Sequence, residues 1–175
     1  MDRGLRRQWE QALRRIPMPE PFGAVAFCEL LGPHLGRELV LVPKASTGGP
    51  CGMVARTDTT DFIFYETATS WTYEQHNILH ECGHLLGNHQ VGREVPLDQQ
   101  TLALAHLDPR RVRLVLARSC YHEGDEQEAE VIATLLGRRV TAPTDLPPLM
   151  DPGMRRVSTA FADEPRRGFG RGSSR

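Results

Sequence analysis

Residues 71–89 read WTYEQHNILHECGHLLGNH and contain His80-Glu81-x-x-His84, the HExxH pattern. Apolar residues recur through this stretch with the spacing of one helical face, so we expect a helix over residues 73–88. Thr72 followed by Gln75 is typical of a capping box, which would mark the start of that helix. The rest of the chain is interpreted outward from this helix.

The two histidines lie on a different face of the predicted helix from its apolar residues. With about 100° of rotation per residue, His80 and His84 stand one turn apart, and Glu81 flanks them. Imidazoles so placed, about 6 Å apart along the axis, can both reach a Zn²⁺ ion at about 2.0–2.1 Å. A carboxylate beside them can take a proton from a water molecule at the metal. The alternative is a surface helix that carries two unrelated histidines.

A catalytic zinc site needs a third protein ligand. On a predicted helix over residues 126–138, Glu128 falls on the axis of the apolar stripe, whereas Glu126 and Glu130 fall on the solvent side. An unpaired carboxylate facing inward is costly, and a metal ion would compensate it. Glu128 could instead belong to a capping box with Asp125 at the N-cap. Other candidate ligands are His76, His89, His106, His122, Asp98 and the acidic residues within 123–130.

Two segments together resemble the ImmA/IrrE-type zinc metallopeptidases, a gluzincin-like family. Residues 80–89, HECGHLLGNH, are similar to the family's HELGHLLLGH, and residues 126–136, EQEAEVIATLL, are similar to its ExEAxxFAxxLLMP block. The resemblance covers roughly residues 20–140. It implies a zincin-like fold, one zinc ion per chain held by His80, His84 and Glu128, and Glu81 as general base. The chain departs from the family pattern at Cys82, Ile132 and Gly137-Arg138.

The resemblance also implies a function, a zinc-dependent endopeptidase that cleaves a regulatory protein partner such as a helix-turn-helix repressor. The alternative is a regulatory binding protein that keeps the zinc site but cleaves little. Tyr121 and His122 precede the helix over 126–138 and could stabilise an oxyanion, although a packed tyrosine and a loop histidine are the simpler interpretation.

An extended peptide substrate needs partners for its backbone, and an exposed strand edge supplies them. We predict that a strand over residues 61–66 is the sheet edge that lines the active-site cleft. The alternative is a core strand whose edges pair with other strands. Phe62 to Tyr65 are all apolar or aromatic, which indicates a strand covered on both faces.

The remaining patterns predict an α+β fold, with a small, mostly antiparallel sheet packed against the HExxH helix. Further helices are expected over 5–16, 22–35, 97–107 and 109–118, and strands over 38–42, 52–56 and 61–66, the last two as a hairpin. We divide the chain into an N-terminal helix with a Pro-rich linker (1–19), a metallopeptidase domain (20–142), and a Pro/Gly/Arg-rich, largely disordered tail (143–175).

The length and composition of the chain limit the class of protein to which it can belong. A chain of 175 residues with 25% charged residues and no long apolar run is typical of one soluble domain. The four cysteines form no CxxC pair, and no apolar segment follows the N-terminal arginines, so we expect a cytoplasmic protein without membrane association. Arginines gather at both ends, but without interleaved aromatic residues they do not favour direct nucleic-acid binding over solvated termini.

Overall fold

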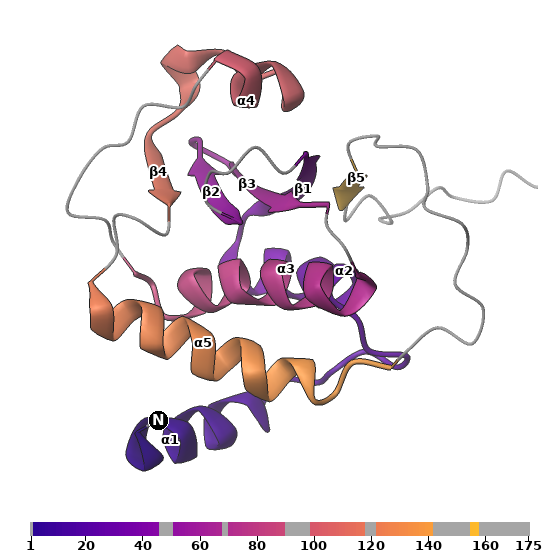
Figure 1. Cartoon of the computed structure of the whole chain (residues 1–175), viewed down its shortest axis with the longest axis vertical. Coiled ribbons are helices and arrows are strands. Elements are labelled where there is room, and N and C mark those ends of the chain that lie inside the picture. The colour runs from indigo at the N-terminus through magenta and orange to yellow at the C-terminus, as the bar shows by residue number, and fades with distance from the viewer. Residues whose placement is uncertain are drawn as a thin grey trace, which may run out of the picture.

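The computed structural model describes residues 2–45, 51–67, 70–89, 99–117, 122–141 and 155–157. They form an α+β fold with a small mixed sheet, as the sequence predicts (Figure 1). Helices α3 (Trp71–Leu86) and α2 (Ala24–Leu35) pack against one face of the sheet, and α4 (Gln99–Leu104) lies over the other. Helix α5 (Glu123–Gly137) packs on α3, away from the sheet, and α1 (Arg3–Leu13) packs on α5.

Among the described residues, the strands of the sheet lie in the order β4-β2-β3-β1-β5. Their bounds are β1 Glu38–Lys44, β2 Gly52–Arg56, β3 Thr60–Glu66, β4 Leu114–Ala117 and β5 Arg155–Val157. Strands β1 and β3 pair in parallel, and the other neighbouring strands pair in antiparallel fashion. The predicted hairpin of β2 and β3 is confirmed, and the sheet is mostly antiparallel as expected.

Both faces of the sheet are covered, because side chains alternate between two apolar clusters along each strand. On β1, Leu39 and Leu41 join the main core with α2 and α3, whereas Val40 and Val42 join the cluster on the opposite face. On β3, the neighbours Ile63 and Phe64 divide in the same way. The prediction that the strand over 61–66 is covered on both faces is therefore confirmed.

The prediction that this strand is a sheet edge is wrong. Strand β3 pairs with β1 from Thr60 to Glu66 and with β2 from Asp61 to Tyr65. Its backbone groups are thus engaged on both sides, and it has no free edge with which to align a peptide. The outer strands of the described sheet are β4 and β5.

The helix predicted over 109–118 is also wrong. Residues Pro109–Arg111 form one turn of 3₁₀-helix, and Leu114–Ala117 form strand β4 against β2. A short apolar run fits a buried helix and a strand equally well, and here the backbone of β2 supplies partners for a strand. The backbone N–H of Arg113 extends the ladder by donating to Arg56 at 2.7 Å.

The N-terminal helix shares the main core with the rest of the fold, since Leu13 is fully buried and Trp9 packs against the same cluster. The tail predicted over 143–175 lies outside the described residues, apart from β5, which pairs with β1. Among the described helices, none combines the length and the apolar character that crossing a membrane requires.

Candidate metal centre

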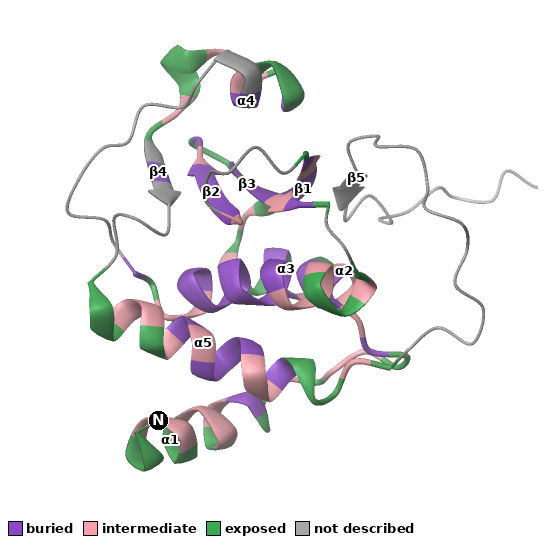
Figure 2. Ribbon diagram, viewed as in Figure 1, coloured by how far each residue is buried: buried purple, intermediate pink, exposed green. Residues whose placement is uncertain are grey.

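Helix α3 is buried along most of its length between the sheet and α5 (Figure 2). It begins two residues earlier than predicted, because the Ser70 side chain accepts a hydrogen bond from Tyr73 N and serves as the N-cap. The predicted capping box of Thr72 and Gln75 is not formed. Gln75 instead accepts a hydrogen bond from the backbone N–H of Ala24 at 2.7 Å, which ties α3 to α2.

The helix separates its apolar residues from its histidines as the sequence predicts. Ile78, Cys82 and Leu85 belong to the main core. His80 and His84 are also buried, with 5% and 1% of their surface exposed, but their ring nitrogens meet a carboxylate of α5.

The third member of this cluster is Glu126. The Nε2 atoms of His80 and His84 lie 3.1 Å apart. Glu126 Oε2 lies 3.5 Å from the first of these nitrogens, and Glu126 Oε1 lies 3.4 Å from the second. Three ligand atoms in a tetrahedral arrangement, each at 2.0–2.1 Å from one zinc ion, lie about 3.3 Å from one another. The residue types suit a zinc ion, and the nearest-atom distance between each pair of side chains is close to this value.

A close approach of two helix backbones brings Glu126 to the histidines. A Cβ atom placed on Gly83 would lie 2.9 Å from both the Cα and the carbonyl oxygen of Ala129 on α5. Only a residue without a Cβ allows this distance, so Gly83 sets how closely α5 approaches the histidine face of α3. Glu126 lies one turn before Ala129 on the same helix.

Glu128, the ligand expected from the sequence, is not part of the His80–His84 cluster. Its carboxylate lies 3.1 Å from His89 Nε2 and accepts a hydrogen bond from the indole of Trp9 at 2.7 Å. The helical phasing assumed that α5 buries one stripe. In the structure α5 packs on α3 and also carries α1, so Glu126 and Glu128 are both half-buried toward different neighbours. The capping alternative is wrong as well, because α5 begins at Glu123 with His122 at the N-cap.

A second group of potential ligands shares His80. His76 Nε2 lies 3.2 Å from Glu130 Oε2, and His80 Nδ1 lies 3.6 Å from the same oxygen. A neutral imidazole has one lone pair, so His80 cannot serve both groups at once. The His80–His84–Glu126 group is the better candidate because His76 and Glu130 are 37% and 44% exposed, whereas both of its histidines are buried.

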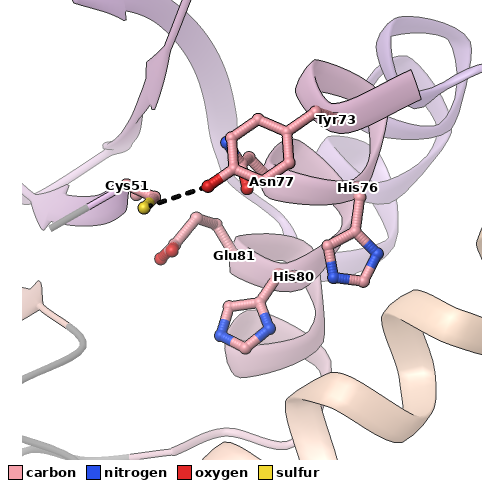
Figure 3. A pocket seen from close by; sticks show the side chains of 7 residues that line it. Cys51, Tyr73, His76, Asn77, His80 and Glu81 are labelled. Carbon is pink, nitrogen blue, oxygen red and sulfur yellow. Dashed lines mark hydrogen bonds between the residues drawn. The ribbon is translucent and has the colours of Figure 1, made fainter. Parts of the chain in front are cut away.

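Glu81, the predicted general base, is 2% exposed and lines a cavity of about 130 Å³ beside His80 (Figure 3). The cavity lies between the start of β2 and the first turns of α3. Its lining comprises Cys51, Gly52, Tyr73, His76, Asn77, His80 and Glu81. A Cβ atom on Gly52 would overlap the Glu81 carboxylate, so this glycine makes room for the side chain.

Two cysteines near the cluster have other roles. Cys82 is buried on the core face, 3.5 Å from the sulfur of Cys28, and this contact together with burial raises the pKa of its thiol well above the usual value. Cys82 belongs to the main core and not to the histidine face of α3, so it is not part of the metal-binding cluster. Cys51 accepts a hydrogen bond from the Tyr73 hydroxyl at 3.1 Å, and this bond raises the pKa of Tyr73.

The other predicted residues that the structure describes lie outside the His80–His84–Glu126 cluster. His89 is buried behind His84, with its Nδ1 2.9 Å from His84 Nδ1. His122 is an exposed N-cap residue, and His106 is exposed beyond α4. Tyr121 and Asp98 lie outside the described residues.

The structure thus brings together the two predicted histidines, and the carboxylate beside them is that of Glu126, which the helical phasing of the sequence had placed on the solvent side. The described residues contain His and Glu groups that could hold a metal ion, and the best of them combines two buried imidazoles with one carboxylate. No family model, curated protein or solved structure matches this chain, so the chemistry of the site rests on its own geometry.

Proposed function

We propose that the protein is a zinc-dependent endopeptidase of the ImmA/IrrE type, with His80, His84 and Glu126 as the zinc ligands and Glu81 as the general base. The observation that carries the proposal is the convergence of two imidazoles and one carboxylate, whose nearest atoms lie 3.1–3.5 Å apart pair by pair, beside a buried glutamate. A catalytic zinc ion has three protein ligands and one open coordination position, and the ligands His80, His84 and Glu126 would leave one position open. The resemblance of residues 80–89 and 126–136 to that family supports the same assignment.

Glu81 would move the proton in this reaction. When bound, zinc supplies Lewis acidity, which polarises the peptide carbonyl and makes a water molecule easier to deprotonate. The Glu81 carboxylate takes a proton from the attacking water, whose oxygen bonds to the carbonyl carbon. The same carboxyl group then gives this proton to the leaving nitrogen as the C–N bond breaks. Its place next to His80 in the cavity wall suits this role.

A peptide substrate would align along β4 instead of β3. Among the described strands β4 pairs only with β2, so its outer edge is available for an extended chain. Ala117 of β4 lies opposite Met53 of β2. Gly52, the residue before Met53, packs against the Glu81 carboxylate. A peptide on this edge would therefore run toward the general base.

The proposed substrate is a regulatory protein, and a helix-turn-helix transcriptional regulator is the first to try, because the family resemblance implies it. The cavity beside Glu81 is small, with a volume of about 130 Å³. The Tyr73–Cys51 hydrogen bond also joins its two walls, α3 and the start of β2. This narrowness favours one alternative, a regulatory binding protein that holds zinc but cleaves little.

Peptide cleavage by the full-length protein tests the proposal. A mixed library of unfolded peptides is incubated with the zinc-loaded protein, and new termini are identified by mass spectrometry. We expect cleavage by the wild type, and loss of nearly all of it in Glu81→Gln with zinc content unchanged, because the amide keeps the shape of the side chain but cannot accept the proton. Cleavage by Glu81→Gln at the wild-type rate would refute the role of Glu81.

The binding-protein alternative gives a different result. The zinc-loaded wild type would then cut no peptide, and it would bind an intact regulator that is recovered whole. The matched control is Glu123→Gln, an exposed glutamate at the start of α5, which should leave both zinc content and cleavage unchanged.

A further inference from the structure

A chain of hydrogen bonds runs from His84 to the N-terminal helix. The Nδ1 atoms of His84 and His89 lie 2.9 Å apart, and His89 Nε2 lies 3.1 Å from Glu128 Oε2. The indole Nε1 of Trp9 donates to Glu128 Oε1 at 2.7 Å. This set of four residues, called the His84 relay below, joins α3, α5 and α1.

The donors and acceptors of the relay fix where its protons lie. The indole of Trp9 can only donate, and the ionised carboxylate of Glu128 can only accept. His89 must then donate through Nε2, and in the neutral ring this leaves its Nδ1 to accept from the Nδ1–H of His84. His84 consequently carries its lone pair on Nε2. That nitrogen is the one that faces His80 and Glu126.

The burial of the His84 relay stabilises this pattern of hydrogen bonds against alternative patterns. The side chains of His84 and His89 are 0% and 4% exposed, and that of Glu128 is 25% exposed. A buried group that loses its hydrogen-bond partner cannot readily replace it with water, so each member keeps the next one in place. Histidines that bind metals are commonly held through their second nitrogen, and such partners fix both the ring orientation and the tautomer.

We propose that His89, Glu128 and Trp9 are positioning residues of the metal centre, which hold His84 with the Nε2 lone pair directed toward His80 and Glu126 and couple the packing of α1 to metal binding. The inference rests on the metal centre of the proposed function, and it gives Glu128 a role other than that of a ligand. Coupling between two binding events is reciprocal, so metal binding should also tighten the packing of Trp9 against α5.

Zinc affinity tests the positioning role. It is measured on the full-length protein by competition with a chromophoric chelator. We expect His89→Phe and Glu128→Gln to weaken zinc binding about 10- to 100-fold. Trp9→Phe keeps the aromatic packing but lacks the donor, and should weaken binding about 2- to 10-fold. The control Glu123→Gln should bind zinc like the wild type.

Cobalt(II) in place of zinc provides a readout that a merely structural role would not move, because its visible absorption reports the ligands and their geometry. Glu128→Gln should keep the wild-type bands at saturating cobalt, since it removes no ligand. Glu126→Gln should change or abolish them. If Glu128→Gln abolishes the bands as Glu126→Gln does, Glu128 is a ligand and the positioning role is refuted.

Trp9 itself reports the coupling. The chain has two tryptophans, so Trp71→Phe leaves Trp9 as the sole indole. Zinc should change the fluorescence of Trp9 in this variant, and adding His89→Phe should remove the response at saturating zinc.

The inference is overturned if zinc affinity is the same in all relay variants, if zinc leaves Trp9 emission unchanged, or if the wild type binds no zinc. Only this last result also ends the proposed function, whereas zinc binding without peptide cleavage refutes the peptidase and leaves the relay standing.

Discussion

Replacing Gly83 by alanine should push α5 away from α3. The alanine Cβ would lie 2.9 Å from the Cα and the carbonyl oxygen of Ala129. Carbon atoms pack favourably at about 3.5–4.0 Å, so the helices must separate locally by about 0.6 Å or more. The atoms in the way belong to the backbone, and no side-chain rotation can relieve the contact. Overpacking of this kind costs about 1–3 kcal/mol of stability.

The displacement also reaches the metal centre, because Glu126 lies one turn from Ala129 on the same helix. Its oxygens lie 3.4 and 3.5 Å from the histidine nitrogens, and a further shift takes them beyond the separation of about 3.3 Å that a tetrahedral zinc ion sets. A misplacement of about 1 Å can cost about 100-fold in function, so we expect Gly83→Ala to weaken zinc binding about tenfold.

Two measurements check this expectation, namely chelator competition for zinc affinity and thermal unfolding of the metal-free protein. The matched control is Gly124→Ala, in the first turn of α5, where an added Cβ meets nothing within 4 Å. The control should keep the zinc affinity and lose no stability, since alanine is the better helix former. Wild-type zinc affinity in Gly83→Ala would show that the close backbone approach does not place Glu126.

Three more predictions concern single side chains. Glu126→Ala should abolish measurable zinc binding while Glu128→Ala only weakens it, and the reverse order, found by elemental analysis and chelator competition, would restore the assignment made from the sequence. Iodoacetamide at neutral pH should modify Cys51 before Cys82, because the raised pKa of the buried Cys82 thiol leaves less thiolate at that pH; peptide mapping that finds Cys82 modified first would contradict this. The fully buried carboxylate of Asp61 on β3 pairs with Arg37 and Arg56, each at 2.9 Å, so Asp61→Ala should lower the free energy of unfolding by about 3 kcal/mol. A loss below about 1 kcal/mol in urea unfolding would contradict this.

The sequence predicts the elements whose periodicity is long and whose ends are marked. Helix α3 and its separate histidine face follow from the spacing of residues 71–89, and the hairpin of β2 and β3 follows from two apolar runs around a polar turn. Both signals are local, because each depends on residues that remain neighbours in the fold.

The failures share a different cause, since each depends on which element lies alongside. Glu126 and Glu128 stand two residues apart on α5, and only the packing of α3 and α1 determines which carboxylate meets His84 and which meets Trp9. The run Leu114–Ala117 becomes a strand because β2 offers an unpaired edge. Residues 61–66 fall inside the sheet because β1, which is separated from β3 in the sequence by β2, pairs in parallel with β3. Periodicity along one segment carries none of this information.

The arrangement of the central strands also bears on the order in which the chain folds. Strands β1, β2 and β3 all lie between Glu38 and Glu66. The contacts between them therefore join residues close in the sequence, and such contacts form faster than those between distant residues. Helix α3 follows directly, while Glu126 arrives only with α5, after the whole segment that carries α4 and β4. During synthesis from the ribosome, the two histidines should thus be in place on a partly formed core before the carboxylate exists to join them.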